Sequence, residues 1–313
     1  MDAVAVVKNY EIEEQRLSED LYRRWIAYID VAEESEKTYR KAMRQFFRYL
    51  SDQKVAKPTR EDIISYKDYL LREHKPTTVQ LYMTTLKLFF QWTAQENIYP
   101  DVAQHIKSAK VDASVHKRDY MTSRQVGKVL EAIDRSSLKG KRDYAMLSLM
   151  VTTGLRTVSI VNADVEDIRT AGDATVLYYK GKGHQGKSIY VKLAAPVEDA
   201  ICDYLKARGN VSGEDPLFAS DANRNNGERM TTRSVSRIAK GSMIDVGLDS
   251  DRLTAHSFRH TAATLNLLNG ASLEETQQLL DHSSITTTMI YAHALERANN
   301  NSENRIASAI FGK

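Results

Sequence analysis

The apolar periodicity of this chain lapses between Lys107 and Arg118, with helical patterns on either side of the gap. The interrupted stretch, SAKVDASVHKR, carries Lys110 and Lys117 among small residues, a composition typical of a linker. The 313 residues are enough for two domains of ordinary size, each with its own hydrophobic core. The lapse therefore predicts two compact units joined by a basic linker, residues 107–118.

The region before the linker, residues 18–106, is predicted to be helical. Its apolar side chains recur three or four positions apart, and strand signals are few. One helix is expected after Thr59, with Glu61 in its first turn, and Pro76 opens another. Residues 18–106 therefore predict a small helical bundle, preceded by a short extension, residues 1–17.

The region after the linker, residues 119–296, is predicted to be mostly helical with a small sheet. Strand-like pieces occur near residues 164–168, 174–179 and 188–193. The turn Gly181-Lys182-Gly183 separates the last two pieces and favours a hairpin. The fold class expected is a mainly α two-domain protein whose second domain contains a small antiparallel β-sheet.

Composition sets broad limits on the compartment and on the partners. The longest apolar stretches are broken by charged residues well short of the ~18 residues that a membrane span needs, so we expect a cytoplasmic protein with no membrane partner. The net charge of +3 permits a nucleic-acid partner without requiring one. The single cysteine, Cys202, lies at helical spacing from Val197, Ile201 and Leu205, and we expect it to pack in the core.

One motif raises the possibility of an ATPase. The sequence GKGHQGKS, residues 181–188, fits the pattern of a phosphate-binding loop. Such a loop needs a helix directly after its Lys-Ser, because the helix N-terminus holds the phosphates. Residues 188–193 instead read as a strand, which argues against an ATPase and leaves Lys182 at a hairpin tip, able to reach a bound ligand.

A zinc enzyme is a second possibility, since His256 and His260 lie one helical turn apart and His282 offers a third ligand. A metalloprotease of the HExxH kind needs glutamate at the position of Ser257. We therefore expect no metal and no cofactor. Core hydrogen bonding is the plainer role for His260.

A stronger signal is spread over the second region. Arg156 follows Thr152-Thr153-Gly154-Leu155, His256 and Arg259 form H-x-x-R, and His282 and Tyr291 follow at spacings of 23 and 9 residues. The stretch LTAHSFRHTAATLNLLNGASLEETQQLLDHSSITTTMIYAH resembles the C-terminal signature of the tyrosine recombinase (phage integrase) family, and TTGLRTVSIVNADVEDI resembles its first box. The resemblance extends over about residues 20–295. It implies a SAM-like core-binding domain followed by a catalytic domain of the DNA breaking-rejoining fold.

The residue types suit the chemistry that the resemblance implies, attack of a tyrosine on a phosphodiester. Arg156 and Arg259 offer planar donor forks that match a phosphate and stay protonated, so no metal ion is needed. By resemblance, Tyr291 is the nucleophile, His256 the base or proton relay, Lys182 the general acid and His282 a donor to the phosphate. Lys182 is the least specific of these assignments, because two other lysines flank it.

The chain departs from the family pattern near these residues. The family usually has an acidic residue three positions after the first arginine, where this chain has Ser159; Asp164 is a possible substitute. The position before His282, commonly glycine, is Asp281, and Phe258 replaces the usual leucine before the second arginine. We expect an active, slow enzyme whose cleavage rate changes when glutamate is restored at position 159.

The resemblance also implies double-stranded DNA with specific recombination sites as the partner. The two domains clamp the duplex, and a homo-tetramer forms on DNA when the tail, residues 297–313, docks in a neighbouring protomer. Each phosphate that a basic residue neutralises releases counterions, which makes binding sensitive to salt. The candidate contacts to DNA phosphates are Thr38, Arg40, Lys41, Arg44, Lys87, Lys117, Arg118 and Arg233.

Several functions remain open at this point. The chain resembles both integrases of mobile elements and resolvases of chromosome or plasmid dimers. The few residues before position 18 leave no room for a separate arm-binding domain, which favours simple sites. A type IB topoisomerase shares the chemistry but commonly has lysine at the position of His256, and a DNA-binding regulator without catalysis is an alternative from another class.

Overall fold

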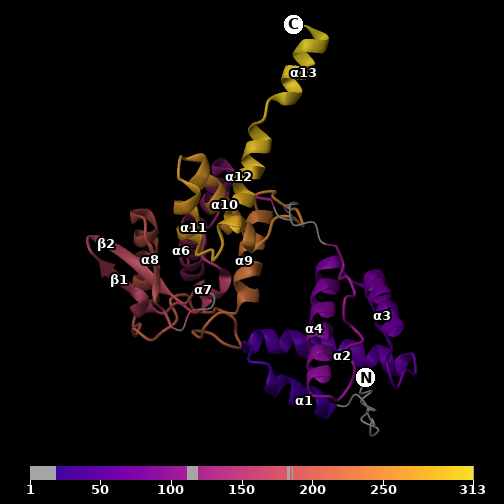
Figure 1. The fold of residues 1–313 in the computed structure, drawn as a ribbon. Coiled ribbons are helices and arrows are strands. Elements are labelled where there is room, and N and C mark those ends of the chain that lie inside the picture. Colours follow the sequence, from indigo (N-terminus) through magenta and orange to yellow (C-terminus); the bar gives the residue numbers. More distant parts are fainter. Residues whose placement is uncertain (1–18, 111–118, 182–183, 185, 313) are drawn as a thin grey trace, which may run out of the picture. The chain divides into compact units, whose positions relative to one another are not determined.

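The computed structural model describes residues 19–110, 119–181, 184 and 186–312, and Figure 1 traces the chain. The chain separates into two compact units, Met1–Ala113 and Ser114–Lys313. Both are dominated by helices, and the second contains a three-stranded antiparallel sheet, which confirms the predicted fold class. Within the described ranges, no helix is both long enough and apolar enough to cross a membrane.

The first unit is a helical bundle built on aromatic packing. Trp25, Phe46 and Phe89 are fully buried, and the rings of Trp25 and Phe89 meet edge to face with centroids 5.5 Å apart. The helix expected after Thr59 is present: the Thr59 hydroxyl accepts from the amide of Asp62, whose carboxylate accepts in return. The helices of this unit are α1 (Glu19–Tyr28), α2 (Glu33–Asp52), α3 (Arg60–Glu73) and α4 (Pro76–Gln95).

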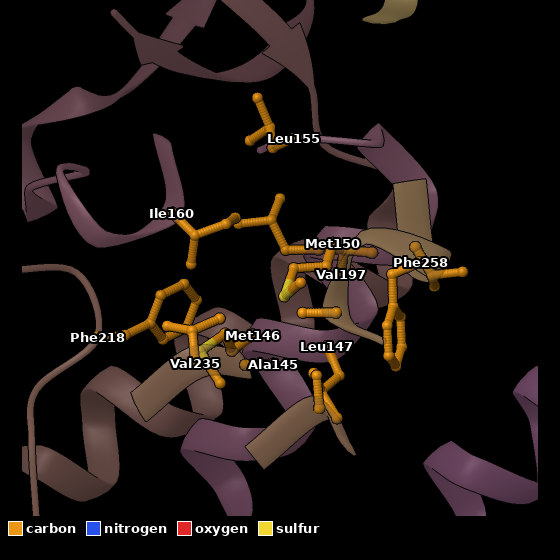
Figure 2. Close-up of a cluster of buried hydrophobic side chains, with 14 of the residues drawn as sticks. Ala145, Met146, Leu147, Met150, Leu155, Ile160, Val197, Phe218, Val235 and Phe258 are labelled. Carbon is orange, nitrogen blue, oxygen red and sulfur yellow. The ribbon is translucent and has the colours of Figure 1, made fainter. Parts of the chain in front are cut away.

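The second unit is organised around a helix that is buried on nearly every side, α6 (Leu138–Thr153). Figure 2 shows its side chains Met146, Leu147 and Met150 gathered with Phe218 and Phe258 from other elements. Such a helix is not amphipathic, because most of its circumference is covered and only a few residues near its ends are exposed. Packed around it or following it are α5 (Ser123–Glu131), α7 (Thr157–Val161), α8 (Ala195–Arg208), α9 (Thr232–Ile244), α10 (Ala255–Leu268), α11 (Leu273–Leu280), α12 (Ile285–Asn299) and α13 (Ser302–Phe311).

The sheet has the strand order β1-β2-β3, with β1 at Ile168–Ala171, β2 at Ala174–Tyr179 and β3 at Ile189–Lys192. All pairs are antiparallel, and Leu177 in the middle of β2 lies opposite Val191 of β3. The β2–β3 connection is the loop that contains Lys182. The small antiparallel sheet predicted from the sequence is therefore confirmed.

Two sequence predictions in this unit are wrong. The strand expected at residues 164–168 is replaced by the 3-10 turn η1 (Val165–Asp167), because the Asp167 carboxylate accepts from the backbone amide of Asp164 at 2.7 Å and closes the turn. Cys202 is exposed and not packed in the core. Helix α8 buries Val197 and Ile201, and the next residue along a helix lies about 100° further round its axis.

Candidate active site

Arg259 of α10 is the most deeply buried charge of the predicted site, with 4% of its surface exposed. Its Nη1 donates to the carbonyl oxygen of Gly154 at 2.7 Å, and its Nη2 donates to the carbonyl oxygen of Leu280. Burial and the nearby charge of Arg156 lower the pKa of Arg259 to about 10, so its side chain is still protonated at neutral pH. Through these two hydrogen bonds, the Arg259 guanidinium links α10 to the C-terminal ends of α6 and α11.

Arg156 enters the site from the turn between α6 and α7. Helix α6 ends at Gly154, which adopts a left-handed conformation with φ of 64°, and Arg156 is the N-cap residue of α7. Its Nη2 donates to the backbone oxygen of Asp281 at 3.3 Å, and its Nη1 lies 3.6 Å from Asp281 Oδ2. Two arginine charges are thus held close together, an arrangement that a bound anion would stabilise.

Tyr291 of α12 lies beside these arginines. Its side chain is 6% exposed and packs with Ala263 and Leu280. Burial raises the pKa of the Tyr291 hydroxyl above its ordinary value, and the charges of Arg259 and Arg156 offset only part of this rise. The two guanidinium groups therefore reduce the cost of deprotonating a buried hydroxyl.

Three histidines continue the site around the tyrosine. The His282 ring is parallel to the Tyr291 ring, with centroids 6.2 Å apart and planes at 4°, and its Nδ1 lies 2.9 Å from Thr288 Oγ1. His260 meets Tyr291 edge to face at 5.0 Å, and His256 meets His260 in the same way at 5.0 Å. Burial and the charges of Arg259, Arg156 and His256 lower the pKa of His282 to about 4. His282 is therefore neutral at neutral pH in the DNA-free protein.

The predicted general acid, Lys182, lies outside the described residues. The residue before it, Gly181, is buried, and an added Cβ there would lie 2.7 Å from Asp281 Oδ2. Of the two flanking lysines, Lys187 pairs with Asp164 at 2.5 Å and also with Asp167, while Lys180 is exposed. The base of the loop that contains Lys182 thus lies against the residue that binds Arg156.

The structure shows the surroundings of Ser159 and Asp281, two positions at which the sequence departs from the family pattern. Ser159 lies buried in α7, and Asp164, the suggested substitute for its missing carboxylate, accepts hydrogen bonds from Lys187 and Arg229. The carboxylate next to Arg156 belongs to Asp281.

Three neighbours of the site were not anticipated from the sequence: Asp281 as a partner of Arg156, His260 against the Tyr291 ring, and Tyr179. The Tyr179 side chain is 3% exposed, and burial together with the charge of Asp281 raises its pKa to about 12. Position offers a signal for two of them. His260 is one helical turn after His256, and Tyr179 ends the strand that leads to the Lys182 loop.

The predicted DNA contacts differ in how far their side chains are engaged within the protein. Arg40 pairs with Glu36 at 2.5 Å, the Thr38 hydroxyl donates to the helix backbone, and Lys87 donates to Ser108 Oγ at 3.3 Å. The exposed candidates on described segments that pair with no described carboxylate are Lys41, Arg44 and Arg233, while Lys117 and Arg118 lie outside the described residues.

The chain resembles known proteins along most of its length. Residues 119–297 match the family model described as the phage integrase family, and residues 18–99 match the model of its N-terminal SAM-like domain. The tyrosine recombinase XerC of Herpetosiphon aurantiacus is 31% identical over 265 residues, which cover 82% of this chain and 83% of that protein.

Solved structures with a similar fold include two complexes with DNA. One is the XerH site-specific recombinase bound to a palindromic difH substrate after cleavage, with 21% identity, a TM-score of 0.71, and coverage of 90% of this chain and 83% of that chain. Another is a lambda integrase tetramer bound to a Holliday junction, with 20% identity, a TM-score of 0.66, and coverage of 87% and 76%.

Proposed function

The chain belongs to the phage integrase family of tyrosine recombinases, and we propose that it cleaves and rejoins DNA through a covalent bond between Tyr291 and a 3′ phosphate. One observation carries this proposal. Arg156, Arg259 and His282, which are far apart in the sequence, all act on the buried hydroxyl or the ring of Tyr291. A tyrosine beside two fixed arginine charges suits attack on a phosphodiester, since charge grows on the non-bridging oxygens as the bond forms.

In the proposed step, the Tyr291 oxygen attacks the phosphorus and the bond to the 5′ oxygen breaks. Arg156 and Arg259 bind the non-bridging oxygens. Two of the five N–H donors of Arg259 bond to the carbonyl oxygens of Gly154 and Leu280, which fixes the plane of the guanidinium group. The other three donors remain for a ligand. Because these dipoles and charges are oriented before DNA arrives, little reorganisation is needed in the transition state.

Two proton transfers complete the step. We assign His256 as the group that accepts the Tyr291 proton, with His260 lying between the two rings at 5.0 Å from each. Lys182 donates a proton to the departing 5′ oxygen, a role suited to a loop next to the arginine site. One phosphoester replaces another, so the 5′ hydroxyl of a second strand can reverse the step without ATP.

The proposal extends to assembly as a tetramer on two DNA sites. Helix α13 has Ile306, Ile310 and Phe311 exposed, at 59%, 67% and 78% of their surfaces. Apolar side chains this open to water are stabilised when a partner covers them. We propose that α13 docks in a neighbouring protomer. The similar fold of a lambda integrase tetramer bound to a Holliday junction supports the tetrameric state.

The biological task within this chemistry is integration or excision of a mobile element, or resolution of chromosome or plasmid dimers, carried out in the cytoplasm. We propose that both domains, residues 18–106 and 119–296, bind the duplex; residues 111–118 of the basic linker lie outside the described residues. Both tasks use the same cleavage step, and they differ in the DNA sequence at which the covalent adduct forms.

The experiment compares wild type with Tyr291→Phe in the source cell. The cells are lysed under denaturing conditions, DNA attached covalently to the protein is recovered, and its ends are sequenced. Tyr190→Phe is the matched control, because it removes the hydroxyl of an exposed strand residue outside the site.

Adducts in wild type and Tyr190→Phe but not in Tyr291→Phe, at one short repeated sequence, support the proposal and identify the target. Adducts scattered over the genome point to a topoisomerase. Tight DNA binding with no adduct in any variant contradicts the catalytic proposal and favours a DNA-binding regulator.

A further inference from the structure

Asp281, between α11 and α12, has an unusual backbone for its residue type. It ends α11 with φ of 49° and ψ of 54°, in the left-handed region that glycine adopts with least strain. Aspartate adopts this conformation more readily than most residues do, but less readily than glycine. Position 281 therefore carries a carboxylate although its backbone conformation favours glycine.

The side chain and the backbone of Asp281 both engage one guanidinium. Its Oδ2 lies 3.6 Å from Arg156 Nη1, and its backbone oxygen accepts from Arg156 Nη2 at 3.3 Å. The two side chains are 20% and 28% exposed, so water screens their charges less than on an open surface. Two contacts to one fork fix the direction of the Arg156 side chain as well as its charge.

No other carboxylate of the described residues takes this place. Helix α7, which follows Arg156, contains no acidic residue, and its Ser159 is 5% exposed. Asp164 is engaged by Lys187 and Arg229. The hydrogen bond and the ion pair of Arg156 to the described part of the chain both go to Asp281.

The same carboxylate lies against the β2–β3 loop. A Cβ added to Gly181 would lie 2.7 Å from Asp281 Oδ2 and 2.6 Å from Ile189 Cδ1. A side chain at position 181 would require the ends of the Asp281 and Ile189 side chains to shift. Asp281 therefore touches the two parts of the site that the proposed mechanism must bring together, Arg156 and the loop that contains Lys182.

We infer that Asp281 is a positioning residue that orients Arg156 toward the scissile phosphate and seats the base of the Lys182 loop. It supplies, from the C-terminal end of α11, the carboxylate that the position of Ser159 lacks. This inference rests on the proposed function, since orientation of Arg156 has a kinetic effect only if Arg156 binds the phosphate.

The test is a double-mutant cycle between positions 156 and 281. Asp281→Asn keeps the volume and the left-handed backbone but removes the charge, and Arg156→Lys keeps the charge but removes the fork. Wild type, both single variants and the double variant are assayed for DNA affinity and the rate of adduct formation on the DNA sequence recovered above, and for their melting temperatures. Asp245→Asn, the same change at the exposed C-terminus of α9, is the matched control.

We expect Asp281→Asn to slow adduct formation about tenfold with DNA affinity unchanged, and to have little further effect in the Arg156→Lys background. Asp245→Asn should behave as wild type. An unchanged rate in Asp281→Asn overturns the inference, as does an equal loss in both backgrounds. A faster rate also overturns it, because the carboxylate would then compete with the phosphate for Arg156.

The melting temperatures separate this inference from the proposed function. A wild type that binds DNA without forming an adduct contradicts the proposed function, and the melting cycle still tests the pair. Coupling between positions 156 and 281 in stability supports the pairing, and additive effects overturn it.

Discussion

Arg259 Nη1 donates a 2.7 Å hydrogen bond to the carbonyl oxygen of Gly154, two residues before Arg156 in the chain. Through this bond, the arginine of α10 fixes the end of the helix that leads to the other arginine. Gly154 meets two requirements there: a φ of 64° and close approach to Leu280. The spacing of the two cations is therefore set by backbone geometry that a side chain at position 154 would disturb.

Gly154→Ala should lower both stability and cleavage. A Cβ at this position would lie 2.5 Å from Leu280 Cδ2, and together with the left-handed conformation the change should cost about 2 kcal/mol in free energy of unfolding. Urea denaturation and the rate of adduct formation measure the two effects. Gly172→Ala is the control, because Gly172 has φ of 61° with nothing within 4 Å of an added Cβ. Equal losses in the two variants would contradict the steric argument.

His282 should make the protein less stable as pH falls from about 6.5 to about 4. Its pKa is lowered to about 4 in the folded protein, against an ordinary value of 6.5, so the unfolded chain binds the extra proton across this window. His282→Gln removes the titrating group. Relative to His282→Gln, wild type should therefore lose free energy of unfolding as the pH falls from 7.5 to 4.5. A constant difference over this range would show that His282 does not titrate as described.

Lys41→Ala and Arg44→Ala should weaken DNA binding at all sequences alike. Both residues are exposed on α2 and pair with no described carboxylate. If each neutralises one phosphate, each substitution should reduce the slope of log affinity against log salt by about 0.9. Lys37→Ala is the control, because Lys37 lies 2.9 Å from Glu33 and 2.8 Å from Glu34. A slope that changes as much for Lys37→Ala would argue for a general charge effect.

Removal of the residues after Ala298 should abolish the pairing of two DNA sites and leave binding to a single site unchanged. The reason is the exposed apolar face of α13, which has no buried residue within its own chain. Synapsis is followed by gel mobility and by analytical ultracentrifugation of DNA complexes. Ile310→Ser should reproduce the loss, and Ser308→Asn, a polar change on the same helix, should not. Unaffected recombination after the truncation would exclude a role for the tail.

The sequence predicted the helical elements well where local signals agree. The helix after Thr59 has both a capping residue and acidic residues in its first turn, and the structure places α3 there. The hairpin around Gly181 also follows from local turn chemistry. These features depend on residues close to one another in the chain.

Predictions failed where a neighbouring side chain sets the local backbone structure, or where one position along a helix separates a buried residue from an exposed one. The Asp167 carboxylate closes a turn where alternating residues suggested a strand. Cys202 is one position out of phase with the buried stripe of α8.

The pairing of Arg156 with Asp281 could not be predicted from the sequence, for a different reason. These residues are 125 positions apart, and the packing of α10 against both α6 and α11 brings them together. A sequence pattern identified the types of residue in the site but not which carboxylate serves which arginine.

Exposure of Cys202 on α8 has a practical consequence. It is the single cysteine of the chain, and thiols that water can reach react readily with maleimide reagents. Each molecule can therefore carry one fluorophore at a defined place without any background substitution. Energy transfer between donor-labelled and acceptor-labelled copies would then report the moment at which two protomers share one DNA.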